Sequence, residues 1–183
     1  MKNASWGNPL LTKCIGVTDN SMSFSDINIS EEYEIPVGDH VGAFGTARKH
    51  DVHKGVDLYT EEGALVFAVE DGVVCNIRPF TGKKAGCPWW LETDAVSVAG
   101  KSGIIVYGEI EIDPCILMGR GIREGTLLGK VKRVLKEDKG RPICMLHLAL
   151  HNHGVQSNGV WKRGEEQPEG LLDPTAYLME ANK

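Results

Sequence analysis

The chain has 183 residues, of which 42% are hydrophobic and 25% charged, a composition that fits one globular domain with room for a core. The formal net charge is −5 and no long run of Lys or Arg occurs, which argues against nucleic acids and anionic membranes as partners. No apolar stretch reaches the length of a membrane span, and no secretory signal is visible, so the sequence as given predicts a cytoplasmic location. The five cysteines contain no CxxC pair, which favours reduced thiols over a cysteine zinc site.

The chain divides into a polar N-terminal part and a longer part with short apolar runs. Residues 1–35 show little periodicity and predict an irregular extension that packs on a core domain formed by residues 36–183. Frequent glycines in the core domain are typical of short strands joined by turns. We predict strands over 63–69 and 73–77, a loop over 79–92, a hairpin over 95–107, and strands over 126–131 and 143–151. Because helices do not alternate with these strands, we predict an all-β antiparallel sandwich or partly open barrel.

Two further segments complete the core domain. Residues 136–141 are polar and predict a turn before the last long strand. Residues 171–180 predict a short closing helix, with Asp173 as its N-cap and Pro174 at its first helical position. No internal repeat is found.

The first candidate for chemistry is the pair His53 and Asp57. Imidazole and carboxylate both bind zinc at about 2.0–2.2 Å, so two such ligands must lie close together. Four residues of straight strand would separate them by roughly 13 Å. The chain therefore has to bend between them, and Gly55 supplies that freedom. A surface histidine and a turn-capping aspartate would explain an isolated HxxxD pattern equally well.

A second candidate lies in the predicted strand 143–151. Strand alternation places Leu146, Leu148 and Leu150 on one face, which reads as a core stripe. His147 then points to the opposite face, which the core does not need. A histidine held on a rigid strand is a metal-ligand candidate, and a solvent-facing strand residue is the alternative.

Taken in order, these segments resemble the lysostaphin-type (LytM-like) zinc endopeptidases, which have the duplicated hybrid motif fold. The resemblance covers roughly Val37 to Leu178 and includes the H-x-H strand of the family at residues 145–147. The matching segments are Phe44-Gly45, Arg48, His53-Lys-Gly-Val-Asp57, Gly63 to Val74, Arg123 to Gly129, Met145-Leu-His147-Leu and Asp173-Pro-Thr-Ala-Tyr-Leu178.

The resemblance implies a zinc site and a hydrolytic activity. His53, Asp57 and His147 would hold one Zn²⁺ per chain, with water or substrate at the fourth position, as a catalytic zinc requires. The implied reaction is hydrolysis of peptide bonds by zinc-activated water. The implied substrates are cell-wall (peptidoglycan-type) peptides that contain glycine or D-amino acids.

The sequence departs from the family at both catalytic histidines. Met145 stands where the first histidine of the H-x-H strand is expected, and methionine cannot move a proton. Tyr107-Gly108-Glu109 stands where the family has a Y-x-H strand. A carboxylate can transfer protons, so we predict Glu109 as the general base. An exposed strand residue is the alternative for Glu109.

The remaining aromatic and histidine residues are candidates for the surroundings of the site. Four of them are candidate substrate-binding residues: Tyr107, His50, Trp89 and Trp90. Side-chain packing on the domain is the alternative for the two tryptophans. His40 is expected near the mouth of the site. His151 and His153 are expected in a turn, where they are solvated or where one serves as a replacement proton donor.

Three functional hypotheses follow. The first is a zinc metalloendopeptidase with Glu109 as its base. The second is a catalytically degenerate zinc-binding module that binds a peptide or protein partner in the same groove, with the metal stabilising the fold. The third is a structural β-domain without a metal. Glu109→Gln separates the first two, because only an enzyme loses turnover while it keeps zinc.

Overall fold

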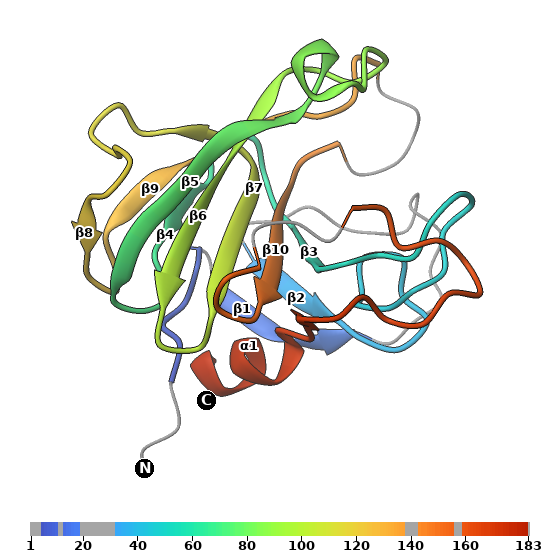
Figure 1. Ribbon diagram of the computed structural model, residues 1–183, viewed down its shortest axis with the longest axis horizontal. Helices are drawn as coiled ribbons and strands as arrows, with labels where there is room; N and C mark the ends of the chain where they lie inside the picture. The colour runs from blue at the N-terminus through green and yellow to red at the C-terminus, as the bar shows by residue number, and fades with distance from the viewer. Residues whose placement is uncertain (1–4, 11–12, 19–31, 138–142, 156–158, 183) are drawn as a thin grey trace.

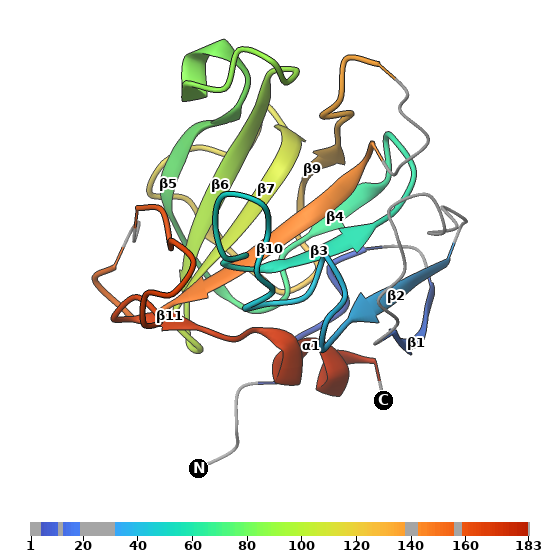
Figure 2. The ribbon, with the colours of Figure 1, turned by 90° about the vertical axis from the view of Figure 1, so that its right-hand side faces the viewer.

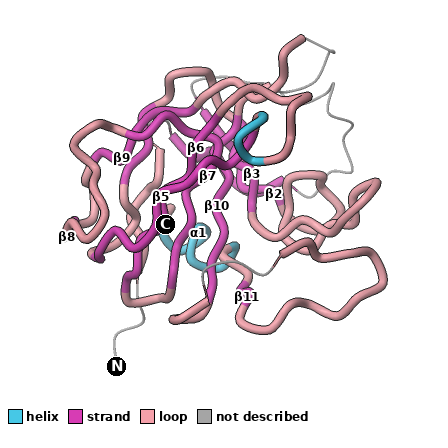
Figure 3. Tube along the Cα trace, turned by 45° about the horizontal axis from the view of Figure 1, so that its top comes forward, coloured by secondary structure: helices cyan, strands magenta, loops and turns pink. Residues whose placement is uncertain are grey.

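The structure is a computed structural model that describes residues 5–10, 13–18, 32–137, 143–155 and 159–182 (Figure 1). Strands dominate the described residues, whose helical segments are a C-terminal α-helix and one short 3-10 turn at Lys83–Ala85 (Figure 3). The elements are β1 Lys13–Thr18, β2 Glu32–Pro36, β3 Val56–Tyr59, β4 Leu65–Phe67, β5 Gly72–Thr81, β6 Thr93–Gly100, β7 Ile104–Ile112, β8 Gly121–Ile122, β9 Leu127–Val131, β10 Met145–His151, β11 Leu171–Leu172 and α1 Thr175–Ala181.

One antiparallel sheet of nine strands contains most of these elements. Its main order is β11-β10-β7-β6-β5-β8, and Figure 1 shows β5, β6 and β7 as long neighbouring ribbons. Strand β3 pairs with β10, while β9 pairs with both β7 and β4. The all-β antiparallel fold with a closing helix is therefore confirmed, and the hairpin predicted over 95–107 is β6 and β7.

Strand β10 lies at the centre of the functional part of this sheet. It pairs with β3 on one edge and with β7 on the other (Figure 2). The leucines Leu146, Leu148 and Leu150 are fully buried in the core, as their alternation predicts. The opposite face of β10 carries His147 and is available for a site.

The sheet divides where β7 leaves β10. Up to Gly108, β7 pairs with β10, and from Ile110 onward it pairs with β9. Glu109 lies between these two halves with φ 65°, and it alone among the described non-glycine residues has a positive φ. The β6–β7 register shifts opposite this point, between Asp94 and Val96. Such irregularities re-aim a side chain and are common next to active sites.

The N-terminal part contributes to the core where the structure describes it. Leu10 is buried, and the Trp6 ring stacks on Tyr177 of α1 with ring centroids 5.0 Å apart. This part was expected to be irregular, but β1 and β2 form a parallel two-stranded sheet. Tyr33 and Ile35 of β2 are buried in the main core. The domain boundary at residue 35 stays a prediction.

Two other local predictions differ from the structure. Helix α1 has Pro174 as its N-cap, one residue later than predicted, although Asp173 still accepts a hydrogen bond from the Thr175 backbone N–H at 2.9 Å. The loop expected over 79–92 begins only after β5 ends at Thr81. The turn predicted over 136–141 falls mostly outside the described residues.

No helix in the described part of the chain is long and apolar enough to cross a membrane.

Candidate metal centre

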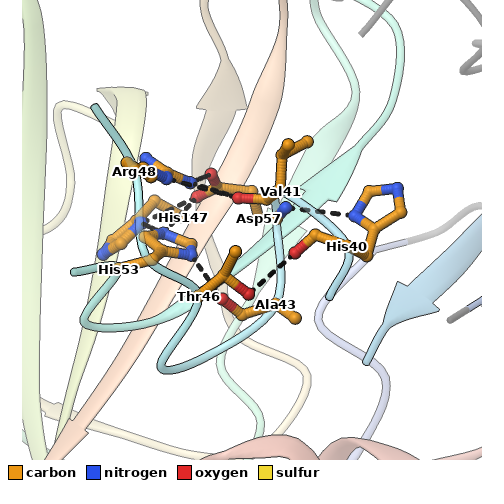
Figure 4. A network of polar contacts seen from close by, with 9 residues as sticks. His40, Val41, Ala43, Thr46, Arg48, His53, Asp57 and His147 are labelled. Carbon is orange, nitrogen blue, oxygen red and sulfur yellow. Dashed lines mark hydrogen bonds and ion pairs between the residues drawn. The ribbon is translucent and has the colours of Figure 1, made fainter. Parts of the chain in front are cut away.

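Three potential ligand atoms converge at the junction of β3 and β10 (Figure 4). Asp57 Oδ1 lies 2.8 Å from His147 Nδ1 and 3.1 Å from His53 Nε2, and the two histidine nitrogens are 3.2 Å apart. Within the described residues, this is the cluster whose ligand atoms could hold a metal ion. The three residues predicted as metal ligands from the sequence are thus close together in the structure.

The strand register brings His147 and Asp57 together. In the β3–β10 ladder His147 stands directly opposite Asp57, and both side chains lie on the face away from the leucine core. Facing residues of antiparallel strands have Cβ atoms about 4.5–5.5 Å apart, which suits two ligands of one ion. His53 reaches the same point from the loop that precedes β3.

Gly55 permits this loop to pass close to His147. A Cβ atom at position 55 would lie 2.7 Å from His147 Cε1 and 2.4 Å from the Leu148 carbonyl oxygen. Neither the strand backbone nor the enclosed ring can give way at such distances. The sequence analysis predicts that Gly55 lets the chain bend between His53 and Asp57. The structure shows instead that Gly55 lets the backbone pass close to His147.

Hydrogen bonds outside the ligand atoms fix their orientation. His53 Nδ1 lies 3.0 Å from the Ala43 carbonyl oxygen, which accepts its N–H, so that the neutral form of the ring carries its lone pair on Nε2. The Arg48 guanidinium donates to the Val41 carbonyl oxygen and forms an ion pair with Asp57 Oδ2. Oδ1 is therefore the carboxylate oxygen that faces the histidines.

The charges at the site suit metal binding. Burial raises the pKa of Asp57, but the charges of His53 and Arg48 and the hydrogen bonds from both histidines outweigh this effect and hold that pKa well below its usual value. Burial lowers the pKa of His147, against the opposing effect of Asp57. At neutral pH the site thus contains a carboxylate and a neutral imidazole, which are the protonation states that bind metal.

Glu109 is a buried carboxyl group beside this cluster. Its side chain is 9% exposed and lines the same cleft as the three candidate ligands. Oε2 has no hydrogen-bond partner among the described residues. Burial, and secondly the charge of Asp57, raise the pKa of Glu109 well above its usual value, while Arg48 opposes this. The alternative of an exposed strand residue is wrong, because Glu109 is enclosed.

The cleft extends from the metal centre across β10 and β7 to β5. Three residues of β10 that alternate along the strand line it, namely His147, Ala149 and His151. His151 was expected in a turn, but it is the last residue of β10 and is 5% exposed. The prediction is therefore wrong for His151. His153 is exposed, as a turn residue would be. About four residues of strand separate His151 from His147, or roughly 13 Å, so His151 lies well away from the metal centre.

The proposed substrate-binding residues separate into two groups. Trp90 lines the cleft, whereas Trp89 is 62% exposed and His50 is exposed, and neither of them lines it. Tyr107 is fully buried in the core, and its hydroxyl accepts a hydrogen bond from the Val69 N–H at 2.9 Å. A substrate role for Tyr107 is therefore wrong in this structure, because core packing encloses its side chain.

Two other residues named in the sequence analysis, His40 and Met145, lie outside the cleft. His40 is buried, and its Nδ1 accepts a hydrogen bond from the Gly42 N–H at 3.0 Å, which holds the turn before the metal-site loop. It does not line the described cleft. Met145 begins β10 opposite Tyr59 and also lies outside the cleft lining.

The sequence analysis missed Arg78 and Phe80, which line the cleft from β5. The predicted strand ended at residue 77, so Arg78 lay outside it and Phe80 fell in the loop predicted over 79–92. Their spacing of two residues would place them on one face of a longer strand. The Phe80 ring lies 5.2 Å from the His147 ring, centroid to centroid.

The comparisons with known proteins agree with the fold. No protein-family model and no curated protein sequence matches the chain. Among solved structures, lysostaphin from Staphylococcus simulans, described as an antimicrobial peptidase, superimposes with TM-score 0.58 at 14% identity, covering 91% of this chain and 56% of that one. Its catalytic domain gives TM-score 0.53 at 15% identity over 80% of this chain and 92% of the domain. The structure of cbpa from L. salivarius REN gives 0.52 at 20% identity over 97% of both chains.

These similarities define the class of fold. The chain has the fold of the lysostaphin-type peptidases, and it spans about half the length of full-length lysostaphin. The likeness includes nearly all of the lysostaphin catalytic domain.

The close approach at Gly55 predicts the effect of one added methyl group. Gly55→Ala should displace His147 and weaken zinc binding at least tenfold, because the methyl group collides with backbone and imidazole atoms. Zinc affinity measured by competition with a chelator tests this. Gly121→Ala is the matched control, since a Cβ there meets no atom within 4 Å. Unchanged affinity in Gly55→Ala would contradict the geometry.

The enclosed carboxyl group predicts a pH-dependent gain in stability. A pKa raised above the ordinary 4.5 means that folded Glu109 holds its proton to higher pH than the unfolded chain does, so wild type loses stability as pH rises above about 4.5. Glu109→Gln should therefore stabilise metal-free protein by about 1–3 kcal/mol near pH 8 and by much less near pH 4.

Urea unfolding at several pH values measures this difference. The control is Glu111→Gln, whose side chain is 53% exposed and pairs with Lys130 at the surface. A gain in Glu109→Gln that does not change with pH would show that the carboxyl group is not held neutral.

Proposed function

We propose that this protein is a zinc-dependent metallopeptidase that hydrolyses peptide bonds in cell-wall (peptidoglycan-type) peptides. The observation that carries the proposal is the convergence of His53, Asp57 and His147 in a cleft that also contains the buried carboxyl group of Glu109. The lysostaphin-type fold supports the same class of reaction.

The donor set fits one zinc ion. Two imidazole nitrogens and one carboxylate oxygen are common ligands of catalytic zinc, and ligands of a tetrahedral ion lie roughly 3.3 Å apart. The distances of 3.1 and 3.2 Å from His53 Nε2 to its two neighbours are close to that spacing. Three protein ligands would leave a fourth position toward the cleft.

Each residue has a distinct task in the proposed reaction. Zinc, when bound, would polarise the scissile carbonyl group and lower the pKa of a coordinated water molecule. Arg48 holds the Asp57 carboxylate in place, and the Ala43 carbonyl group orients His53. The charge of a bound zinc ion would lower the pKa of Glu109, and the resulting carboxylate would accept the proton of the attacking water at Oε2 and deliver it to the leaving amine.

The buried position of Glu109 supports its assignment as the proton carrier. A non-glycine residue at positive φ and an unpartnered buried carboxylate oxygen each cost stability, by about 1–3 kcal/mol. Functional sites tolerate such losses of stability because catalysis needs an available proton acceptor. Glu109 would thereby replace the catalytic histidine that the related family has at this position.

The alternative is a degenerate zinc-binding module that binds a peptide or protein partner. Met145 favours it, because the side chain at this position cannot transfer a proton. In that case the metal would stabilise the fold by joining β3, β10 and the preceding loop, and Glu109 would have no chemical task.

Zinc content tests the metal centre, which both the peptidase and the binding module require. Protein purified without a metal-affinity tag should contain about one zinc per chain, and His147→Ala should lose most of it, because two protein ligands remain. Elemental analysis gives the stoichiometry. His153→Ala is the control, since that histidine is exposed and lies outside the cleft. Absence of zinc in wild type after incubation with the ion would contradict both functions.

Turnover of the zinc-loaded protein distinguishes the metallopeptidase from the zinc-binding module. Glu109→Gln should reduce kcat by about 10²–10⁴-fold with zinc content unchanged, because the amide cannot accept a proton. Cleavage of a blocked pentaglycine peptide, or release of fragments from purified peptidoglycan, measures the rate. Glu111→Gln should match wild type. Equal rates in Glu109→Gln and wild type would remove Glu109 from the mechanism.

A further inference from the structure

The wall of the cleft opposite the metal centre is formed by β5. Arg78 and Phe80 alternate along this strand and therefore lie on the same face of the sheet. The Arg78 guanidinium carbon lies 5.4 Å from the centroid of the Phe80 ring, and that ring contacts His147. A single aromatic side chain thus separates the guanidinium group from a candidate zinc ligand.

Arg78 has no acidic partner in the described part of the chain. The ion pairs of the cleft use Arg48 with Asp57, whereas no carboxylate of a described residue lies within ion-pair distance of Arg78. Its Nε is enclosed and has no hydrogen-bond partner among the described residues. Arginine has five N–H donors in a planar fork, so an unpaired one in a cleft is prepared for an anionic ligand.

The surrounding charges leave this end of the cleft positive. Lys54 also lines it and lies near enough for its charge and that of Arg78 to repel each other. Of the three acids that line the cleft, Asp57 is paired with Arg48, Glu109 lies at the metal centre, and Asp51 interacts with Lys54. Among these acids of the described cleft lining, none is paired with Arg78.

We propose that Arg78 binds a carboxylate of the substrate, so that the cleft selects peptides that carry an acidic group within a few residues of the scissile bond. This inference rests on the proposed peptidase function and adds the substrate class. The Phe80 ring sets the spacing between the guanidinium group and the metal centre. An extended peptide advances about 3.3 Å per residue, so the carboxylate belongs to a residue within one to three positions of the cleaved bond.

The test uses blocked pentaglycine peptides in which each position in turn is replaced by Glu or by Gln. These side chains have nearly the same shape and differ in charge. We expect kcat/KM to be at least tenfold higher for Glu than for Gln at one position, and we expect salt to reduce this ratio. Pentaglycine with a free C-terminal carboxylate, compared with its amide, distinguishes a terminal from a side-chain carboxylate.

The variants assign the preference to a residue. Arg78→Gln should bring the Glu to Gln ratio close to one, mainly by slowing cleavage of the Glu peptide. Arg163→Gln removes the same charge from an exposed site outside the cleft and should keep the ratio. A preference that survives in Arg78→Gln would overturn the assignment. If that variant does not fold, equal rates for Glu and Gln peptides in wild type overturn it directly.

A binding measurement separates this inference from the proposed function. Trp90 lines the cleft, so tryptophan fluorescence can report peptide binding without turnover. Cleavage of all peptides at equal rates would leave the peptidase and remove the carboxylate preference. Arg78-dependent binding of Glu peptides without any cleavage would support the carboxylate site and contradict the peptidase. Absence of both binding and cleavage would overturn the carboxylate site.

Discussion

The pairing of β10 on both of its edges is the constraint on which the site depends. Hydrogen bonds to β3 fix Asp57 opposite His147, and hydrogen bonds to β7 fix Gly108 on the other side of the same residue. A shift of one residue in either ladder would turn His147 into the leucine core. Because a register error would bury a histidine and expose leucines, the hydrophobic effect that drives folding also sets the geometry of the candidate metal centre.

The point where the sheet divides gives the cleft its carboxyl group. Beyond Gly108 the strand β7 changes partner from β10 to β9, and Glu109 takes up a left-handed backbone conformation at this change. A regular strand would direct successive side chains to opposite faces. The irregular backbone instead places Glu109 in the cleft that contains His147, so the fold accepts local strain and an enclosed carboxyl group at the same residue.

The sequence allowed the sheet and the cluster of three candidate ligands to be predicted, but not the whole cleft. Alternating leucines determine which face His147 occupies, and this period-two pattern is local. The burial of Tyr107 and the enclosure of Glu109 depend on strand pairings between distant segments, which alternation alone does not reveal. Arg78 was missed because Pro79 and the following residues resemble a loop, although proline is tolerated in an outer strand.

The position of β5 at the side of the sheet has a consequence for how a ligand is held. In the part of the chain that the structure describes, β8 pairs with β5 at Gly72 and Val73 alone, so the rest of β5 forms the outer ladder beside the cleft. Pro79 in this part has no N–H group, and a proline in an outer strand prevents further strands from joining the sheet. A peptide bound in the proposed cleft would therefore contact this part of β5 through its side chains instead of being added as another strand.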